Sequence, residues 1–194
     1  MTITGTGAVQ AVSGDGISVG FSGSSGYVLT AAIYGIGQVD ATQGTAIIGD
    51  FAAGSSGIPD TGIFIGVNPD NADDAAAAAA KLSQSITGLV GIDARVSESA
   101  SIAIATKAGG TVTGTSGKGI VTSAKDGATT IDIGDTVRGK TDAISATATG
   151  TGNITIYSTA RIASEYKANA DDLAYTDGTG NGISASSQGG ANAI

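Results

Sequence analysis

Most of the chain consists of short segments in which apolar and polar residues alternate. The clearest are "GISVGF" (16–21), "SIAIAT" (101–106) and "NITIYSTARIA" (153–163). A period of two places every apolar side chain on one face of an extended strand, as in a strand that is buried on one side. Glycine, serine, threonine, asparagine and aspartate separate these segments and favour turns. The pattern therefore predicts many short β-strands.

The kind of aliphatic residue points in the same direction. The chain holds 22 isoleucines and 11 valines but only 4 leucines. β-branched side chains fit a pleated, half-buried surface better than they fit a helix. Glycine is frequent, with 32 residues, but 41% of the chain is hydrophobic. We therefore expect a folded, mainly β protein and not a disordered chain.

One segment, at about 69–87, has a helical pattern instead. The six consecutive alanines Ala75–Ala80 have the highest intrinsic helix propensity. Asn68 or Asn71 can cap the N-terminus of this helix, and Gly88 would end it. Its apolar face consists mostly of methyl groups, so we expect the helix to lie directly against a sheet.

The turn residues between successive strands favour antiparallel pairing. A strand at Ile92–Val96 is followed by a short turn and the alternating segment 101–106. A hairpin is expected around Gly150–Asn153. We therefore predict an antiparallel sandwich or barrel-like sheet that carries the alanine-rich helix (about 69–87) and extended terminal arms.

The chain is expected to have two parts. Residues 1–140 form a β-rich domain, which contains a helix-and-two-strand (αββ) module at 63–140. Residues 141–194 form a C-terminal hairpin and an extended arm. Glycine-rich ends fray on an isolated subunit, so we expect neighbouring subunits to hold them.

Two segments in different parts of the chain look alike. They are "SGKGIVTSAKDG" (116–127) and "TGNGISASSQGG" (179–190). Glycine and serine composition alone produces such matches. Because no fixed period relates these segments to the remainder of the chain, we predict no internal repeat.

Charge narrows the range of partners. The formal net charge is -8. An acidic chain is a poor ligand for nucleic acid or for an anionic membrane, so neither is expected as a partner.

No apolar run approaches the roughly 20 residues that span a bilayer, and the first ten residues do not resemble a signal peptide. We expect synthesis in the cytoplasm.

The residue types leave little room for catalysis or for a cofactor. The chain has no histidine and no cysteine. Nucleophilic catalysis would then need a Ser–Lys or threonine arrangement or paired carboxylates, and no spacing indicates one. We predict that the chain is not an enzyme. Among hard-oxygen ligands, Asp171, Asp172 and Asp177 are the candidate Ca²⁺ ligands, although their spacing does not fit an EF-hand.

A run of segments between Phe64 and Ile144 resembles a known pattern. In order, these segments are "IFIGV", "NADDAAAAAAKLSQSI", "TGLVGIDARV", "IAIATKAGG", "GKGIVTSAKDG" and "DTVRGKTDAI". The order resembles that of bacteriophage virion proteins of the tail and head surface. It is also similar to an αββ motif in the outer domains of flagellins and hook-associated proteins. The long coiled-coil termini of flagellins are absent here, which counts against flagellin itself.

The resemblance implies a structural function. We expect a virion protein, either a capsid decoration protein or a tail subunit. It would form homo-oligomers and bind other virion proteins through strand edges and terminal arms. The alternative is a cell-surface filament or adhesin outer domain that binds a receptor or a glycan.

Overall fold

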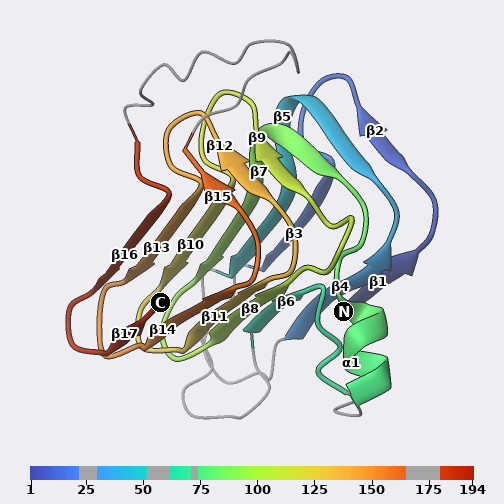
Figure 1. The fold of residues 1–194 in the computed structure, drawn as a ribbon. Helices are drawn as coiled ribbons and strands as arrows, with labels where there is room; N and C mark the ends of the chain where they lie inside the picture. The colour runs from blue at the N-terminus through green and yellow to red at the C-terminus, as the bar shows by residue number, and fades with distance from the viewer. Residues whose placement is uncertain (22–29, 52–61, 71–73, 165–179) are drawn as a thin grey trace.

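The computed structural model describes residues 1–21, 30–51, 62–70, 74–164 and 180–194 (Figure 1). These residues form two sheets and one short helix, α1 (Asp74–Ala80). The first sheet, called sheet A here, holds β1 (Thr2–Gly5), β4 (Thr30–Ile36), β6 (Gly62–Ile65), β8 (Ser101–Ala105), β11 (Thr129–Ile133), β14 (Ile154–Ser158) and β17 (Asn192–Ala193). The second, sheet B, holds β2 (Val9–Ala11), β3 (Ile17–Phe21), β5 (Val39–Phe51), β7 (Ile86–Val96), β9 (Val112–Gly114), β10 (Ile120–Ala124), β12 (Val137–Gly139), β13 (Ile144–Ala148), β15 (Ile162–Ala163) and β16 (Ile183–Ser187).

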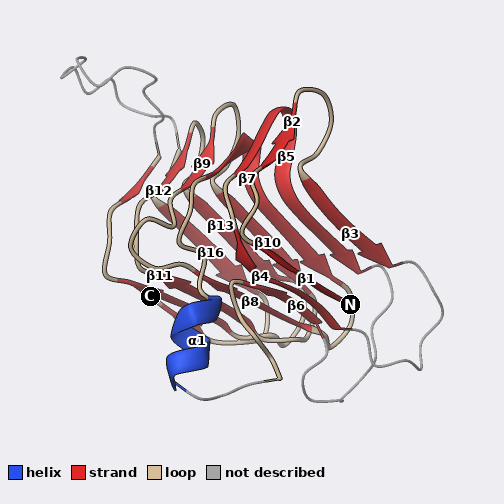
Figure 2. Cartoon of the chain, turned by 90° about the vertical axis from the view of Figure 1, so that its right-hand side faces the viewer, coloured by secondary structure: helices blue, strands red, loops and turns tan. Residues whose placement is uncertain are grey.

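Every pair of neighbouring strands in both sheets is parallel. The chain passes from sheet A to sheet B and back, and each strand pairs with the strand that follows one turn later. The turns therefore stack on one another as coils of a parallel β-solenoid. In Figure 1 the colour runs along the stack from β1 to β17, and Figure 2 shows the same strands from the side.

The core consists of columns of equivalent side chains, one from each coil. One column in sheet B holds Ile17, Ile47, Ile92, Ile120, Ile144 and Ile183. A second column, in sheet A, holds Ile3, Ile33, Ile65, Ile104, Ile131 and Ile156. The four middle isoleucines of the sheet B column are completely buried. Full burial of such a side chain contributes about 1.5–3 kcal/mol, so the columns explain the isoleucine-rich composition.

The mainly β prediction is confirmed, but the predicted antiparallel arrangement of the sandwich or barrel-like sheet is wrong, because the strands pair in parallel. The strand at Ile92–Val96 belongs to β7 in sheet B, whereas the segment 101–106 contains β8 in sheet A. In the same way, β13 and β14 flank Gly150–Asn153 but lie in different sheets, and each pairs in parallel with strands of other coils. The turns are therefore corners between sheets and not hairpins.

The terminal arms and the predicted helix also need correction. The two ends form β1 and β17, the outermost strands of sheet A, and are not arms. The helix is shorter than the predicted 69–87, because Leu82 forms a parallel bridge with Thr106 and Ile86 begins β7. Leu82 and Ile86 are 1% and 0% exposed. Burial of these side chains in the coil stack thus overrides helix propensity.

The two similar segments turn out to be structurally equivalent. Ile120 and Ile183 occupy the same column, each at the start of a strand of sheet B. The predicted absence of an internal repeat is therefore wrong: the coil repeats, although its length varies. Strands before and after the predicted boundary at residue 140 share both sheets.

Candidate assembly surfaces

The two ends of the solenoid are the first candidate site. At the N-terminal end, β1 is the outermost strand of sheet A, and β2 and β3 pair only with β5 among the described strands. Ile3, Val9 and Ala11 are only partly buried there, although they pack against the core. Each of these side chains is the first member of a core column. The members of these columns in the middle of the stack are only 0–2% exposed. The N-terminal end is thus an apolar surface bordered by strand edges.

The C-terminal end has the same character. Its outermost described strands are β17 in sheet A and β15 and β16 in sheet B. Ile162, Ile183 and Ala185 are partly buried, and Ile194 is 76% exposed. At both ends, therefore, core columns stop without a covering coil in the part of the chain that the structure describes.

Main-chain hydrogen bonds join the coils in a regular ladder. The N–H of Ile92 donates to the carbonyl of Gly119 at 2.9 Å, and Ile120 donates to Ala143 at 2.8 Å. Ile144 donates in turn to Gly182 at 3.0 Å. Each column isoleucine thus bonds the residue that precedes the isoleucine of the next coil. At an outer edge, the corresponding donors or acceptors face outward and can pair with another strand.

Carboxylates join the coils at the corners. Asp142 accepts the N–H of Asn181 at 2.8 Å, and Lys118 lies 3.2 Å from its other oxygen. The Asn181 hydrogen bond, with the nearby Lys118 ammonium group, lowers the pKa of Asp142.

Two further corner carboxylates behave in the same way. Asp126 accepts the N–H and the hydroxyl of Thr151, and these bonds lower its pKa. Asp135 accepts N–H groups of Thr136 and Gly109, which lower its pKa as well. These three carboxylates thus hold the turns in place by accepting main-chain N–H groups.

A cleft beside α1 is the second candidate site. It has a volume of about 330 Å³ and lies between the helix and the outer face of sheet A. Its lining comes from Gly66, Val67, Asn68, Ala77, Lys81, Ala103, Ile104, Ala105, Thr130 and Asp132. The prediction that the helix lies directly against a sheet thus holds only for its last turn, where Ala80 is buried.

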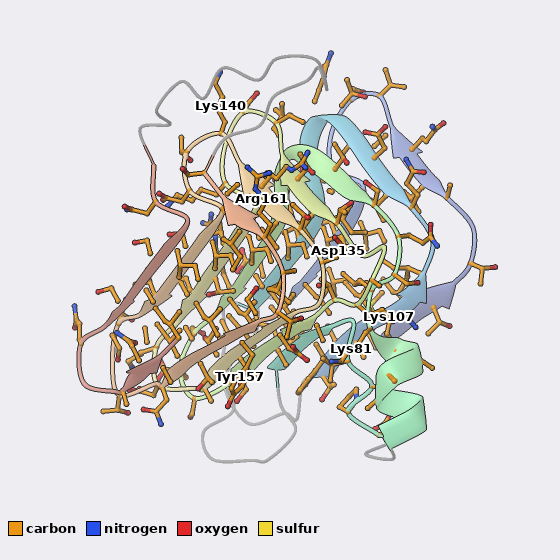
Figure 3. All side chains as sticks on the ribbon, in the orientation of Figure 1. Lys81, Lys107, Asp135, Lys140, Tyr157 and Arg161 are labelled. Carbon is orange, nitrogen blue, oxygen red and sulfur yellow. The ribbon has the colours of Figure 1, made fainter. Side chains whose placement is uncertain are left out.

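Charged and aromatic groups surround this cleft. Lys81 forms an ion pair with Asp132, and Lys107 donates to the carbonyl of Ala78 at 3.0 Å. Tyr157 stands beside Asp132 on the next strand and is 62% exposed. Figure 3 shows Lys81 and Lys107 near α1. The lining is mainly apolar, and its two charged side chains, Lys81 and Asp132, pair with each other.

The three predicted Ca²⁺ ligands, Asp171, Asp172 and Asp177, lie outside the described residues. Among the residues that the structure does describe, no group of three acidic side chains is placed to hold a metal ion. Within that same part of the chain, no helix is both long enough and apolar enough to cross a membrane.

The sequence analysis predicts contacts through strand edges but does not locate these edges. The signal that was available is the glycine or alanine that precedes most column isoleucines, as in "GDGI" (14–17), "GKGI" (117–120), "TDAI" (141–144) and "GNGI" (180–183). Aligning these positions gives the coil repeat and hence the two ends.

No known protein family, no curated protein and no solved structure matches this chain.

Proposed function

We propose that this chain is a structural subunit of a bacteriophage virion, either a capsid decoration protein or part of the tail. Its partners are copies of itself and other virion proteins. The observation that supports this proposal is the pair of solenoid ends, where strand edges border half-buried core columns. An exposed strand edge next to apolar side chains is a template for adding a strand from another chain.

The proposal includes no catalytic role. Histidine and cysteine are absent from the sequence. The corner carboxylates Asp126, Asp135 and Asp142 are engaged by main-chain N–H groups. The strands described at the two ends carry no charged side chain, so little desolvation opposes a contact between subunits there.

Immunogold labelling tests the proposal. Phage particles are purified from cells that carry this gene, labelled with an antibody against the chain and imaged in negative stain. We expect gold at a fixed place on heads or tails. Particles from a phage that lacks the gene are the control. If the chain is expressed but remains in the soluble fraction, away from any particle, the proposal is wrong.

The cleft beside α1 favours a second candidate function, an adhesin-like or filament outer domain. Lys81, Asp132 and Tyr157 would supply the polar and stacking contacts that a glycan or a receptor needs. Screening the purified chain against a glycan array tests this, with Tyr157→Ala as the matched variant. Binding that Tyr157→Ala abolishes would favour the second candidate over the virion.

A further inference from the structure

The two sheets do not end at the same level. In the described part of the chain, sheet A has seven strands in sequence, from β1 to β17. Sheet B has six layers: β2 with β3, β5, β7, β9 with β10, β12 with β13, and β15 with β16. The described chain both begins and ends in sheet A, and β17 is followed by no described strand of sheet B. Among the described strands, β16 (Ile183–Ser187) pairs only with β13, and we call its other edge the β16 slot.

The β16 slot continues an interface that already repeats inside the chain. Gln188 donates its N–H to Ala148 of β13, and Gly182 accepts from Ile144 of the same strand. Because hydrogen-bonding direction alternates along a strand, the N–H groups of Ile183, Ala185 and Ser187 face the other way, into the slot. Ile183 thus corresponds to Ile92, Ile120 and Ile144, whose N–H groups each donate to a carbonyl of the next coil.

Burial shows that a covering strand would fit there. Ile120 and Ile144 are 0% exposed and Ala146 is 1% exposed, because the next coil covers each of them. Ile183 and Ala185, the next members of the same two columns, are only partly buried. One more strand would close both columns as the internal strands do.

We propose that the β16 slot binds a single extended strand donated by a neighbouring subunit, parallel to β16. This rests on the proposed assembly function. By continuity with the coil-to-coil interface, the donated strand would carry a small residue, then isoleucine or valine, then small residues alternating inward. The carbonyl of its first small residue would accept the N–H of Ile183, as Gly119, Ala143 and Gly182 do inside the chain.

The step between the sheets explains why the occupant is one strand and not the whole end of a second copy. In an end-to-end stack, β1 of the second copy could pair with β17, but sheet B would then lack one strand. If β3 of the second copy paired with β16 instead, its β1 would need the place that β17 occupies. A lone strand meets neither difficulty.

A peptide tests the proposal directly. The probe is a labelled peptide with the sequence of residues 141–149, "TDAISATAT", which includes β13. The control peptide has aspartate in place of its isoleucine. We expect fluorescence anisotropy with the full-length chain to show binding of the first peptide and at least about tenfold weaker binding of the control. Equal binding of both peptides, or no binding at millimolar peptide, would overturn the proposal.

A variant of the chain locates the contact. Ala185→Pro removes a donor that faces the slot, so the strand should remain paired with β13 while peptide binding is lost. Ser184→Pro is the matched variant, since it removes a donor that faces β13 and should disturb the strand. If Ala185→Pro does not fold, amide exchange of the wild-type chain gives the answer: the peptide should protect Ile183, Ala185 and Ser187 but leave their even-numbered neighbours unchanged.

Two outcomes separate this proposal from the proposed function. If gold labels the virion but the peptide does not protect the amides that face the slot, the chain is a virion protein whose slot is not a strand-binding site. If the purified chain forms linear oligomers and Ala185→Pro leaves them intact, copies join through sheet A, and the single-strand proposal is wrong.

Discussion

Thr129 places a hydroxyl between two isoleucines of a core column. It stands between Ile102 and Ile154, is 1% exposed, and its Oγ1 has no hydrogen-bond partner among the described residues. A buried polar group without a partner costs roughly 1–3 kcal/mol. We expect Thr129→Val to raise the free energy of unfolding by about 1 kcal/mol, measured by urea denaturation.

Thr130→Val is the control for this prediction. Thr130 is the next residue of β11, but it is exposed on the outer face of sheet A. Its substitution should change the stability by no more than about 0.5 kcal/mol. If Thr129→Val lowered the stability instead, the threonine hydroxyl would be favourable at this position and the prediction would be wrong.

The corner carboxylates make stability depend on pH. The pKa values of Asp126 and Asp142 are lower in the folded chain than the ordinary 3.8, chiefly because main-chain N–H groups donate to them. The unfolded chain therefore binds protons more readily. The stabilisation is present above the unfolded pKa of about 3.8 and is lost as the pH falls through the lower folded value.

Replacing both side chains with asparagine tests this dependence. Asp126→Asn with Asp142→Asn keeps an acceptor oxygen at each corner but removes the titration. We expect the double variant to lose less of its thermal midpoint than the wild type between pH 4 and pH 2, as measured by circular dichroism. Parallel curves for the two proteins would show that other groups control the acid transition.

At the scale of the elements, the close approach of neighbouring corners limits which side chains fit there. Gly127, in the turn between β10 and β11, lies against the turn one coil earlier, and a Cβ there would be 1.7 Å from the carbonyl oxygen of Ala100. Gly127→Ala therefore forces two coils apart, and we expect it to lower the free energy of unfolding by about 2 kcal/mol or more. Gly7→Ala, where no atom lies within 4 Å, is the control and should be nearly neutral in the same urea titration.

The elements also show why strands were predictable and their pairing was not. The alternation in "SIAIAT" is a local property, so it located β8 correctly. Pairing depends on which strand lies alongside, and the residues at Gly150–Asn153 suit a corner as well as a hairpin. The helix was found at its alanines, but its end was misplaced, because burial of Leu82 is set by distant coils.

The coil repeat escaped detection because its length varies. The interval is 24 residues from Ile120 to Ile144 but 45 residues from Ile47 to Ile92, where α1 is inserted. The β16 slot was equally hidden. In sequence, the "GNGI" that contains Ile183 looks like the "GKGI" that contains Ile120, and only the number of layers in each sheet distinguishes a covered strand from an open one.

At the scale of the whole molecule, a stack of coils should open from its ends. Each coil is held by its two neighbours, so an end coil has half the contacts of a middle one. We expect the amides of β7 and β10 to exchange with deuterium most slowly, and those of β1 and β16 to exchange much faster, as measured by hydrogen exchange with mass spectrometry. The matched comparison is Ile120 with Ile183, which share one column but differ in burial. Uniform protection along the stack would mean that the chain opens only as a unit. The half-covered ends would then be as stable as the middle, and a neighbouring subunit would not be needed to stabilise them.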